Sequence, residues 1–172
     1  MKCVLRPVQE SDVTLLYNWR NDELVRKNSF SEGKINFEEH NTWFTSVLRN
    51  PHVFFYVLEI DENPIGQVRL NKTGNSCIIS YSIAEEYRAQ GYGKLILRLV
   101  ENECVKKGFA DSLVGYVKKN NIASQVIFKS LGYTETDEIS FYRYEKIKLC
   151  YTSDEDILRD KVCSGGRYIT TH

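Results

Sequence analysis

A glycine-rich stretch at residues 85–96, EEYRAQGYGKLI, contains the residue types best suited to holding a charged ligand. It follows an apolar run and leads into a helical apolar pattern, so Gly91 and Gly93 stand where a loop enters a helix. The first N–H groups of a helix have no partner within it, and with the helix dipole they form an anion site. Glycine lets a ligand approach the backbone closely. We therefore expect this turn to bind an anionic group.

Two common phosphate motifs do not describe this turn. A dinucleotide site needs GxGxxG in a parallel βαβ unit and a P-loop needs GxxxxGK[ST], and the sequence contains neither at this place. Taken alone, the six residues 88–93 also fit an ordinary glycine-containing turn before a helix. The surrounding elements must decide between the two interpretations.

The hydrophobic periodicity predicts an α/β chain in which three strands joined by short turns precede the glycine-rich turn. The turns are DENP and KTGN, so these strands should form an antiparallel meander. Gly108 is a stop signal for the helix that follows the turn. The expected strands are residues 2–8, 53–60, 65–71, 76–84, 112–117 and 140–149, and the expected helices are residues 11–21, 37–48, a segment ending at 108, and 121–131.

Composition limits the class of protein. The chain has 172 residues, of which 42% are hydrophobic, so it can bury a sizeable core in one domain. Lys and Arg total 23, as do Asp and Glu, and this balance argues against nucleic acid as the main partner. No stretch approaches the about 18 apolar residues of a membrane span, and the N-terminus lacks the apolar core of a signal peptide.

The five cysteines are widely spaced and form no CxxC pair, which argues against a disulfide framework and against a zinc site. A reduced, cytosolic setting without a metal fits best. We expect one catalytic domain at residues 1–149. Residues 150–172 form a C-terminal tail of weak helical periodicity, partly disordered or helical, to which we assign no chemistry.

The residues Arg88-Ala89-Gln90-Gly91-Tyr92-Gly93 resemble the Q/R-x-x-G-x-G/A signature of the GNAT superfamily of N-acetyltransferases. A second segment, NNIASQVIFKSLGY at residues 120–133, is similar to the second cofactor segment of that family. The resemblance covers residues 1–149. It implies a mixed, mostly antiparallel sheet of about six to seven strands flanked by about four helices.

The resemblance implies acetyl-CoA as the cofactor. Its pyrophosphate would lie on the backbone amides of the turn, its pantetheine beside the preceding strand, and the second segment would contact it from the other side. A backbone N–H of Ser82 or Ile83 would stabilise the thioester oxygen as it gains negative charge. The implied cofactor residues are Tyr81, Ser82, Ile83, Arg88, Ala89, Gln90, Gly91, Tyr92, Gly93, Lys94, Asn121, Ser124 and Phe128.

Phe128 stands where many members of the family carry a tyrosine that protonates the departing thiolate. Phenylalanine cannot donate a proton, so three alternatives remain. Tyr116 or Tyr81 replaces the missing acid, the thiolate leaves unprotonated, or the protein binds acetyl-CoA without efficient catalysis. Tyr116 also fits a plain strand position in the core.

The N-terminal segments LLYNWRNDELVRKNSF and INFEEHNTWF suggest the acceptor. They resemble the amino-sugar N-acetyltransferases of pseudaminic acid and surface polysaccharide biosynthesis, which implies a nucleotide-linked amino sugar as substrate. Arginines can pair with its diphosphate, tryptophans offer a flat face for a base or sugar, and His40 can accept the proton of the amine. The candidate substrate residues are Trp19, Arg20, Arg26, His40 and Trp43.

Each of these five residues alone also fits an ordinary core or surface role. The alternative functions are acetylation of a protein N-terminus or small amine, and non-catalytic binding of acyl-CoA. A homodimer is compatible with every alternative, and the sequence does not fix the oligomeric state.

Overall fold

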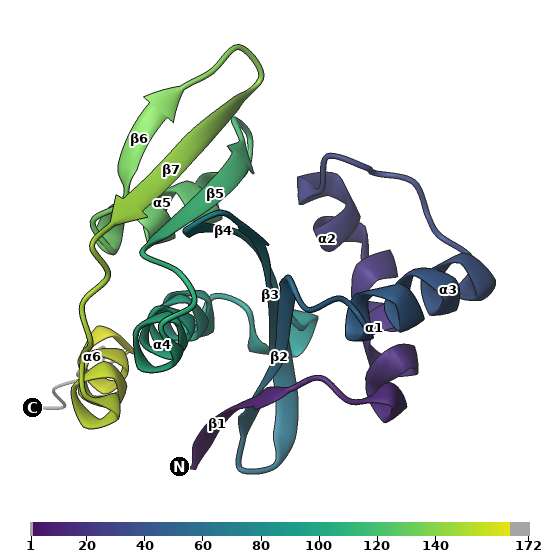
Figure 1. The fold of residues 1–172 in the computed structure, drawn as a ribbon, viewed down its shortest axis with the longest axis horizontal. Helices are drawn as coiled ribbons and strands as arrows, with labels where there is room; N and C mark the ends of the chain where they lie inside the picture. The colour runs from purple at the N-terminus through teal and green to yellow at the C-terminus, as the bar shows by residue number, and fades with distance from the viewer. Residues whose placement is uncertain (1, 166–172) are drawn as a thin grey trace, which may run out of the picture.

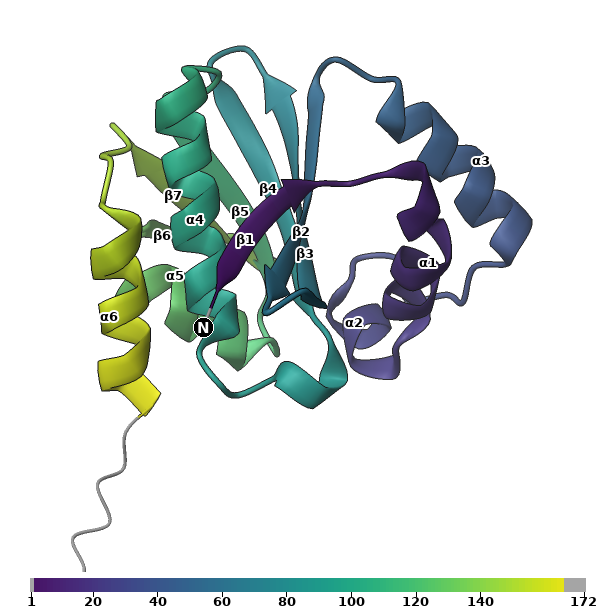
Figure 2. The ribbon, with the colours of Figure 1, turned by 90° about the horizontal axis from the view of Figure 1, so that it is seen from below.

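The computed structural model describes residues 2–165, and these form a seven-stranded sheet with helices on both faces (Figures 1 and 2). The strand order is β1-β2-β3-β4-β5-β7-β6. The strands are β1 Cys3–Pro7, β2 Val53–Ile60, β3 Asn63–Thr73, β4 Ser76–Ile83, β5 Ser112–Lys118, β6 Thr134–Asp137 and β7 Phe141–Ile147. The helices are α1 Val13–Asn21, α2 Glu23–Asn28, α3 Phe37–Leu48, α4 Tyr92–Lys107, α5 Ile122–Ser130 and α6 Asp154–Gly165.

Two layers of helices enclose the sheet. Helices α1, α2 and α3 lie against one face, here the α1 face, and α4 and α5 lie against the other, here the α4 face (Figure 2). On the α4 face Ile96, Leu97 and Val100 are fully buried, as are Val68 and Leu70 of β3. The apolar core of the protein is therefore packed between β3 and α4.

The expected meander is confirmed. Strands β2, β3 and β4 pair antiparallel in sequence order, and the first turn has positive φ values at Asp61 and Glu62. The predicted fold class is confirmed as well, because every pairing in the sheet is antiparallel except that of β4 with β5.

The parallel pair β4 and β5 separates partway along its length. Their register runs from Ser76 opposite Ser112 to Ile79 opposite Gly115 and stops there, although β4 continues to Ile83 and β5 to Lys118. We call the diverging segments, 80–83 and 116–118, the β4–β5 fork. Backbone groups that face into the fork are not used in pairing between these two strands.

The structure contains a helix and a strand that the sequence did not predict. Helix α2 begins at Asp22, whose side chain accepts the N–H of Val25 at 2.9 Å. Strand β6 has the sequence TETD, and all its residues are exposed, so no apolar alternation marks it. The first helix is preceded by a short 3-10 turn at Glu10–Asp12.

The first part of the C-terminal tail is helical. Helix α6 lies beside α4 (Figure 1), and the side chain of Ile157 is only 1% exposed. Asn102 of α4 fixes the entry to α6, because its side chain donates to the carbonyl of Thr152 at 2.6 Å and accepts the N–H of Thr152 at 3.0 Å. Residues 166–172 of the tail lie outside the described part.

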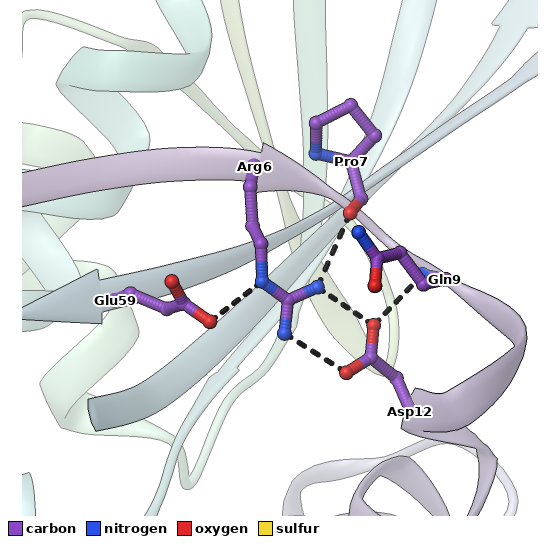
Figure 3. Close-up of polar contacts among 5 residues, drawn as sticks. All are labelled: Arg6, Pro7, Gln9, Asp12 and Glu59. Atoms are coloured by element: carbon purple, nitrogen blue, oxygen red, sulfur yellow. Dashed lines mark hydrogen bonds and ion pairs between the residues drawn. The ribbon is translucent and has the colours of Figure 1, made fainter. Parts of the chain in front are cut away.

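A partly buried ion-pair cluster fixes the start of the N-terminal helices (Figure 3). The guanidinium of Arg6 on β1 donates to Glu59 of β2 at 2.6 Å and to both carboxylate oxygens of Asp12 at 2.7 and 2.9 Å. Asp12 also accepts the N–H of Gln9 at 2.8 Å. These hydrogen bonds outweigh burial and hold the pKa of Asp12 below its usual value.

Within residues 2–165, no helix is long and apolar enough to cross a bilayer. The same residues contain no group of His, Cys, Asp and Glu side chains arranged to hold a metal ion.

Candidate active site

The glycine-rich turn has the backbone conformation of an anion-binding loop. Ala89 and Gly91 have φ values of 57° and 81°, and Gly91 is the N-cap of α4. No side chain caps this helix, so the N–H groups of its first turn are directed away from the helix toward solvent or a ligand. Successive backbone amides in such a turn form a concave donor surface that suits a phosphate group.

Gly93 has a different reason to be glycine. A Cβ at this position would lie 2.8 Å from Cδ1 of Ile127 and 3.5 Å from the ring of Tyr81. Gly93 therefore allows α4 to approach α5 and β4 closely. Its role in the structure is packing, whereas the sequence suggested only close approach of a ligand.

The side chains of the signature hold the turn in place. Arg88 donates from Nε to the carbonyl of Ile83 at 3.0 Å and from Nη2 to Asp22 at 2.5 Å. Gln90 donates to the carbonyl of Glu86 at 2.8 Å. Arg88 thus connects the end of β4 to the N-cap of α2, while Lys94 lies half-buried in the first turn of α4.

Ile83 presents its backbone N–H to the β4–β5 fork. The N–H of Ala84 donates to the carbonyl of Ile65 on β3, and the N–H groups of a strand alternate between its two sides. The amides of Tyr81 and Ile83 therefore face the fork, and that of Ser82 faces β3. Between the two donors suggested by the sequence, this alternation favours Ile83.

Tyr81 lies on the α4 face beside the fork. Its hydroxyl is 3.0 Å from the hydroxyl of Ser124 on α5, and burial raises its pKa to about 12. The phenol is therefore a neutral hydrogen-bond donor over the whole physiological pH range.

Phe128 belongs to the core beneath Tyr81. Its ring is 2% exposed and stacks on Tyr144 at 5.2 Å between ring centroids. A Cβ on Gly115 would lie 2.4 Å from its Cζ, so the ring rests directly on the backbone of β5. The edge of the Tyr81 ring meets it at 6.1 Å.

Asn121 caps α5. Its side-chain oxygen accepts the N–H of Ser124 at 3.2 Å, which leaves the NH₂ group of the same amide as the donor for a ligand.

Tyr116 lies on the opposite face of the sheet from Tyr81. Gly115 is covered by Phe128 on the α4 face, and neighbouring residues of a strand alternate, so Tyr116 is on the α1 face. Its side chain is 39% exposed and packs edge-on against Phe141 at 5.5 Å. The two phenols proposed as substitute acids are thus separated by the sheet, and only Tyr81 is close to Ser124.

The N-terminal candidates lie in the helix layer of the α1 face. Arg20 donates from Nη2 to the carbonyl of Ser31 at 2.8 Å, and Arg26 donates from Nη1 to the carbonyl of Glu32 at 3.1 Å. Both arginines therefore hold the loop between α2 and α3. Trp19 is half-buried on α1.

His40 is buried inside this layer, with 1% of its surface exposed. Its Nε2 is 3.0 Å from the carbonyl of Val13, its ring stacks on Phe44, and burial lowers its pKa. The helical periodicity had already placed His40 on the same face as Phe44. In the structure His40 packs between α1 and α3.

Arg69 is a residue of this face that the sequence analysis missed. It lies on β3 directly opposite Ser80 of β4 and Phe55 of β2. Its guanidinium carbon is 5.0 Å from the centroid of the Trp43 ring. The sequence feature that could have placed Arg69 is its position between Val68 and Leu70. These two residues are buried on the α4 face, so strand alternation directs Arg69 to the other face.

Comparisons with known proteins agree with this geometry. The sequence model of the acetyltransferase (GNAT) domain family matches residues 2–134. An uncharacterized protein of Methanocaldococcus jannaschii is 26% identical over 145 residues, which are 78% of this chain. The chain spans only 28% of the length of that relative.

Two solved structures have similar folds. Spermidine N-acetyltransferase from Vibrio cholerae, in complex with CoA and spermine, has a TM-score of 0.79 at 16% identity, covering 85% of this chain and 95% of that chain. A ribosomal L7/L12 alpha-N-protein acetyltransferase in complex with coenzyme A has a TM-score of 0.74 at 16% identity, covering 86% and 94%.

Proposed function

We propose that this chain, which belongs to the acetyltransferase (GNAT) domain family, is an acetyl-CoA-dependent N-acetyltransferase whose acceptor is the amine of a nucleotide-linked amino sugar. The acetyl-CoA fits the turn at residues 88–94, where α4 begins without a side-chain cap. When bound, it supplies an activated acetyl thioester. The backbone amides of the turn would hold its pyrophosphate, and the side-chain NH₂ of Asn121 would be available to its pantetheine arm.

We assign the oxyanion-stabilising hydrogen bond to the backbone N–H of Ile83. This amide faces the β4–β5 fork and belongs to a paired strand, so it is held in position before reaction. A preorganised donor of this kind contributes about 2.7–4 kcal/mol to transition-state stabilisation.

We assign the proton donor for the thiolate to Tyr81. Its Oη would give a proton to the departing sulfur and regain one from solvent after the product leaves, and its hydrogen-bond partner Ser124 Oγ holds the phenol in orientation. The amine attacks in its neutral form and releases its proton to solvent. This proposal gives His40 no part in these steps, because its imidazole is buried between α1 and α3 and hydrogen-bonds the carbonyl of Val13.

The observation that supports the acceptor proposal is the charge of the α1 face. Arg20 and Arg26 both lie there, half-buried and without an ion-pair partner among the described residues, and Arg69 of the same face stacks on Trp43. Half-buried cations that lack a carboxylate disfavour a polycationic acceptor such as a polyamine and favour an anionic one.

A substrate panel tests this proposal. Release of free thiol is measured with nucleotide-linked amino sugars, spermidine, aminoglycosides and N-terminal peptides, each at several concentrations. The proposal predicts the highest kcat/KM for a nucleotide-linked amino sugar. A higher kcat/KM for any of the other amines would show that the acceptor assignment is wrong while leaving the family assignment in place.

A further inference from the structure

Arg69 and Arg20 have buried donors that nothing in the described chain satisfies. Nε of Arg69 and Nη1 of Arg20 are both inaccessible to solvent and have no hydrogen-bond partner. A buried N–H group without a partner costs folding free energy, and a guanidinium is protonated at every relevant pH. Two such groups on one side of the sheet leave hydrogen-bonding capacity that an acceptor group could use after a small side-chain rotation.

Arg20 on α1 and Arg69 on β3 belong to the same side of the sheet, because Arg69 faces away from the side on which Val68 and Leu70 are buried (Figure 2). The charge of Arg20 contributes, after burial, to lowering the pKa of Arg69, and Arg26 acts in the same way on Arg20. The three arginines therefore repel one another in a partly desolvated layer, a cost that an anion between them would remove.

The acids of this layer do not neutralise the two arginines. Asp22 pairs with Arg88 and Glu32 with Lys118, while the remaining carboxylates of α2 and α3, those of Glu23, Glu38 and Glu39, are exposed. Among residues 2–165, neither Arg20 nor Arg69 forms an ion pair with a carboxylate. The protein thus supplies cations here and no internal counter-ion.

Arg69 is held rigidly for this purpose. Its guanidinium lies over Trp43 at 5.0 Å and near Phe55 at 6.0 Å, and stacking on aromatic rings fixes the plane of a guanidinium while leaving its in-plane donors for another partner. Trp43, which the sequence predicts to contact the substrate, supports this arginine in the structure.

The subsite lies at a useful distance from the fork. Arg69 pairs with Ser80, and Ser80 is three residues before Ile83 on β4, which corresponds to roughly 10 Å along the strand. A pyranose ring with a phosphate on its anomeric carbon can cover that length. An amine at Ile83 and a phosphate at Arg69 are therefore compatible with one acceptor molecule.

We propose that Arg20 and Arg69 form a phosphate subsite on the acceptor side, which selects amines linked to a phosphate or diphosphate. This inference rests on the proposed function for the identity of the acceptor, but the subsite itself is defined by the two arginines. Bidentate recognition of phosphate by a guanidinium fork is the chemistry that such a pair offers.

The test begins with inorganic pyrophosphate and protein saturated with CoA, so that the turn at residues 88–94 is blocked. Binding is measured by calorimetry for the wild type, Arg20→Met, Arg69→Met and the control Arg49→Met, an exposed arginine at the end of α3. We expect the first two variants to weaken binding about tenfold to a hundredfold, in line with the loss of one charge-assisted hydrogen bond, and the control to match the wild type. Equal affinity in all four proteins, or no binding to the wild type, would overturn the subsite.

Turnover separates the subsite from the acceptor assignment. Arg69→Met should raise KM for a nucleotide-linked amino sugar and leave KM for the same sugar without phosphate unchanged. If the wild type turns over no nucleotide sugar but its pyrophosphate binding depends on the two arginines, the acceptor assignment is wrong and the subsite is retained. If Arg69→Met turns over the nucleotide sugar with the same KM as the wild type, the subsite is wrong and the acceptor assignment is retained.

Two further measurements exclude a folding defect. Removal of an unpaired buried charge should leave the Tm of Arg69→Met equal to or above that of the wild type, whereas a structural arginine would lower it. Arg69→Lys, which retains the charge and loses the planar fork, should show intermediate pyrophosphate affinity.

Discussion

Substitution of Gly93 by alanine separates the two reasons for which this residue can be glycine. If a Cβ at Gly93 blocks the phosphate, acetyl-CoA affinity falls whatever surrounds the residue. If the Cβ is too close to Ile127, as the 2.8 Å distance indicates, removal of Cδ1 by Ile127→Val should restore the affinity. We expect the second result.

The contact geometry sets the magnitude. A distance of 2.8 Å is well below the 3.4–4 Å of ordinary van der Waals contact, but the contacted atom is the end of a side chain that can rotate. Overpacking costs about 1–3 kcal/mol, and alanine regains up to about 1 kcal/mol of helix propensity over glycine. Gly93→Ala should therefore destabilise the protein by about 1 kcal/mol, or roughly 2–4 °C in Tm.

The assay is a double-mutant cycle with two readouts, the unfolding free energy in urea and the Kd for CoA by calorimetry. The two substitutions should couple by about 0.5–1 kcal/mol, with the double variant more stable than the sum of the single effects. Its Kd should lie within about threefold of the wild type. Gly108→Ala is the matched control, because Gly108 has a φ of 62° at the far end of α4 with no atom near its Cβ position, so it should lose stability without losing CoA affinity.

A CoA affinity that falls equally in Gly93→Ala and in the double variant would refute the packing explanation. Absence of coupling in the unfolding free energy would refute it independently.

The other predictions concern proton transfer and pH. Tyr81→Phe should lower kcat by about 10²-fold and Tyr116→Phe by less than about twofold, and the reverse pattern in steady-state kinetics would exclude Tyr81 as the acid. Because the pKa of Tyr81 is raised to about 12, kcat should show no fall from its deprotonation up to about pH 10 in a pH–rate profile. Phe128→Tyr should not raise kcat, since Tyr81 already supplies the proton, but it should lower Tm in a thermal melt, because the new hydroxyl enters buried space against the β5 backbone. The pKa of His40 is lowered in the folded state, so its contribution to the unfolding free energy is complete above about pH 6.5 and is lost as the pH falls. His40→Asn should therefore reduce the slope of the unfolding free energy against pH, measured in urea titrations between pH 8 and 5.5.

The sequence predicted the meander and α4 because their signals are local. Apolar and aromatic runs define β2 and β4, and Gly108, with a φ of 62°, ends α4 where the pattern placed a stop. Helix α2 was missed because its six residues carry little apolar periodicity, and the side chain that starts it, Asp22, is itself fixed by Arg88 from the turn before α4. Contacts over 66 residues of chain leave no trace in a local window.

The parts of the candidate site that are formed by the backbone could be predicted from the sequence. The turn at 88–94 and the cap at Asn121 follow from glycine and asparagine at defined offsets. Arg69 could not be found in this way, because a single arginine in a strand fits solvent exposure equally well. Only the pairing of β3 with β4 and the packing of α3 place it beside Arg20 and under Trp43.

Arg88 joins parts of the molecule that serve different substrates. One of its nitrogens holds the carbonyl of Ile83 and another holds the carboxylate that starts α2, so rigidity gained at the turn is passed to the layer that carries Arg20 and Arg26. If acetyl-CoA orders the turn as proposed, part of the entropic cost of ordering this layer is met before the acceptor binds, and the coupling is reciprocal at equilibrium.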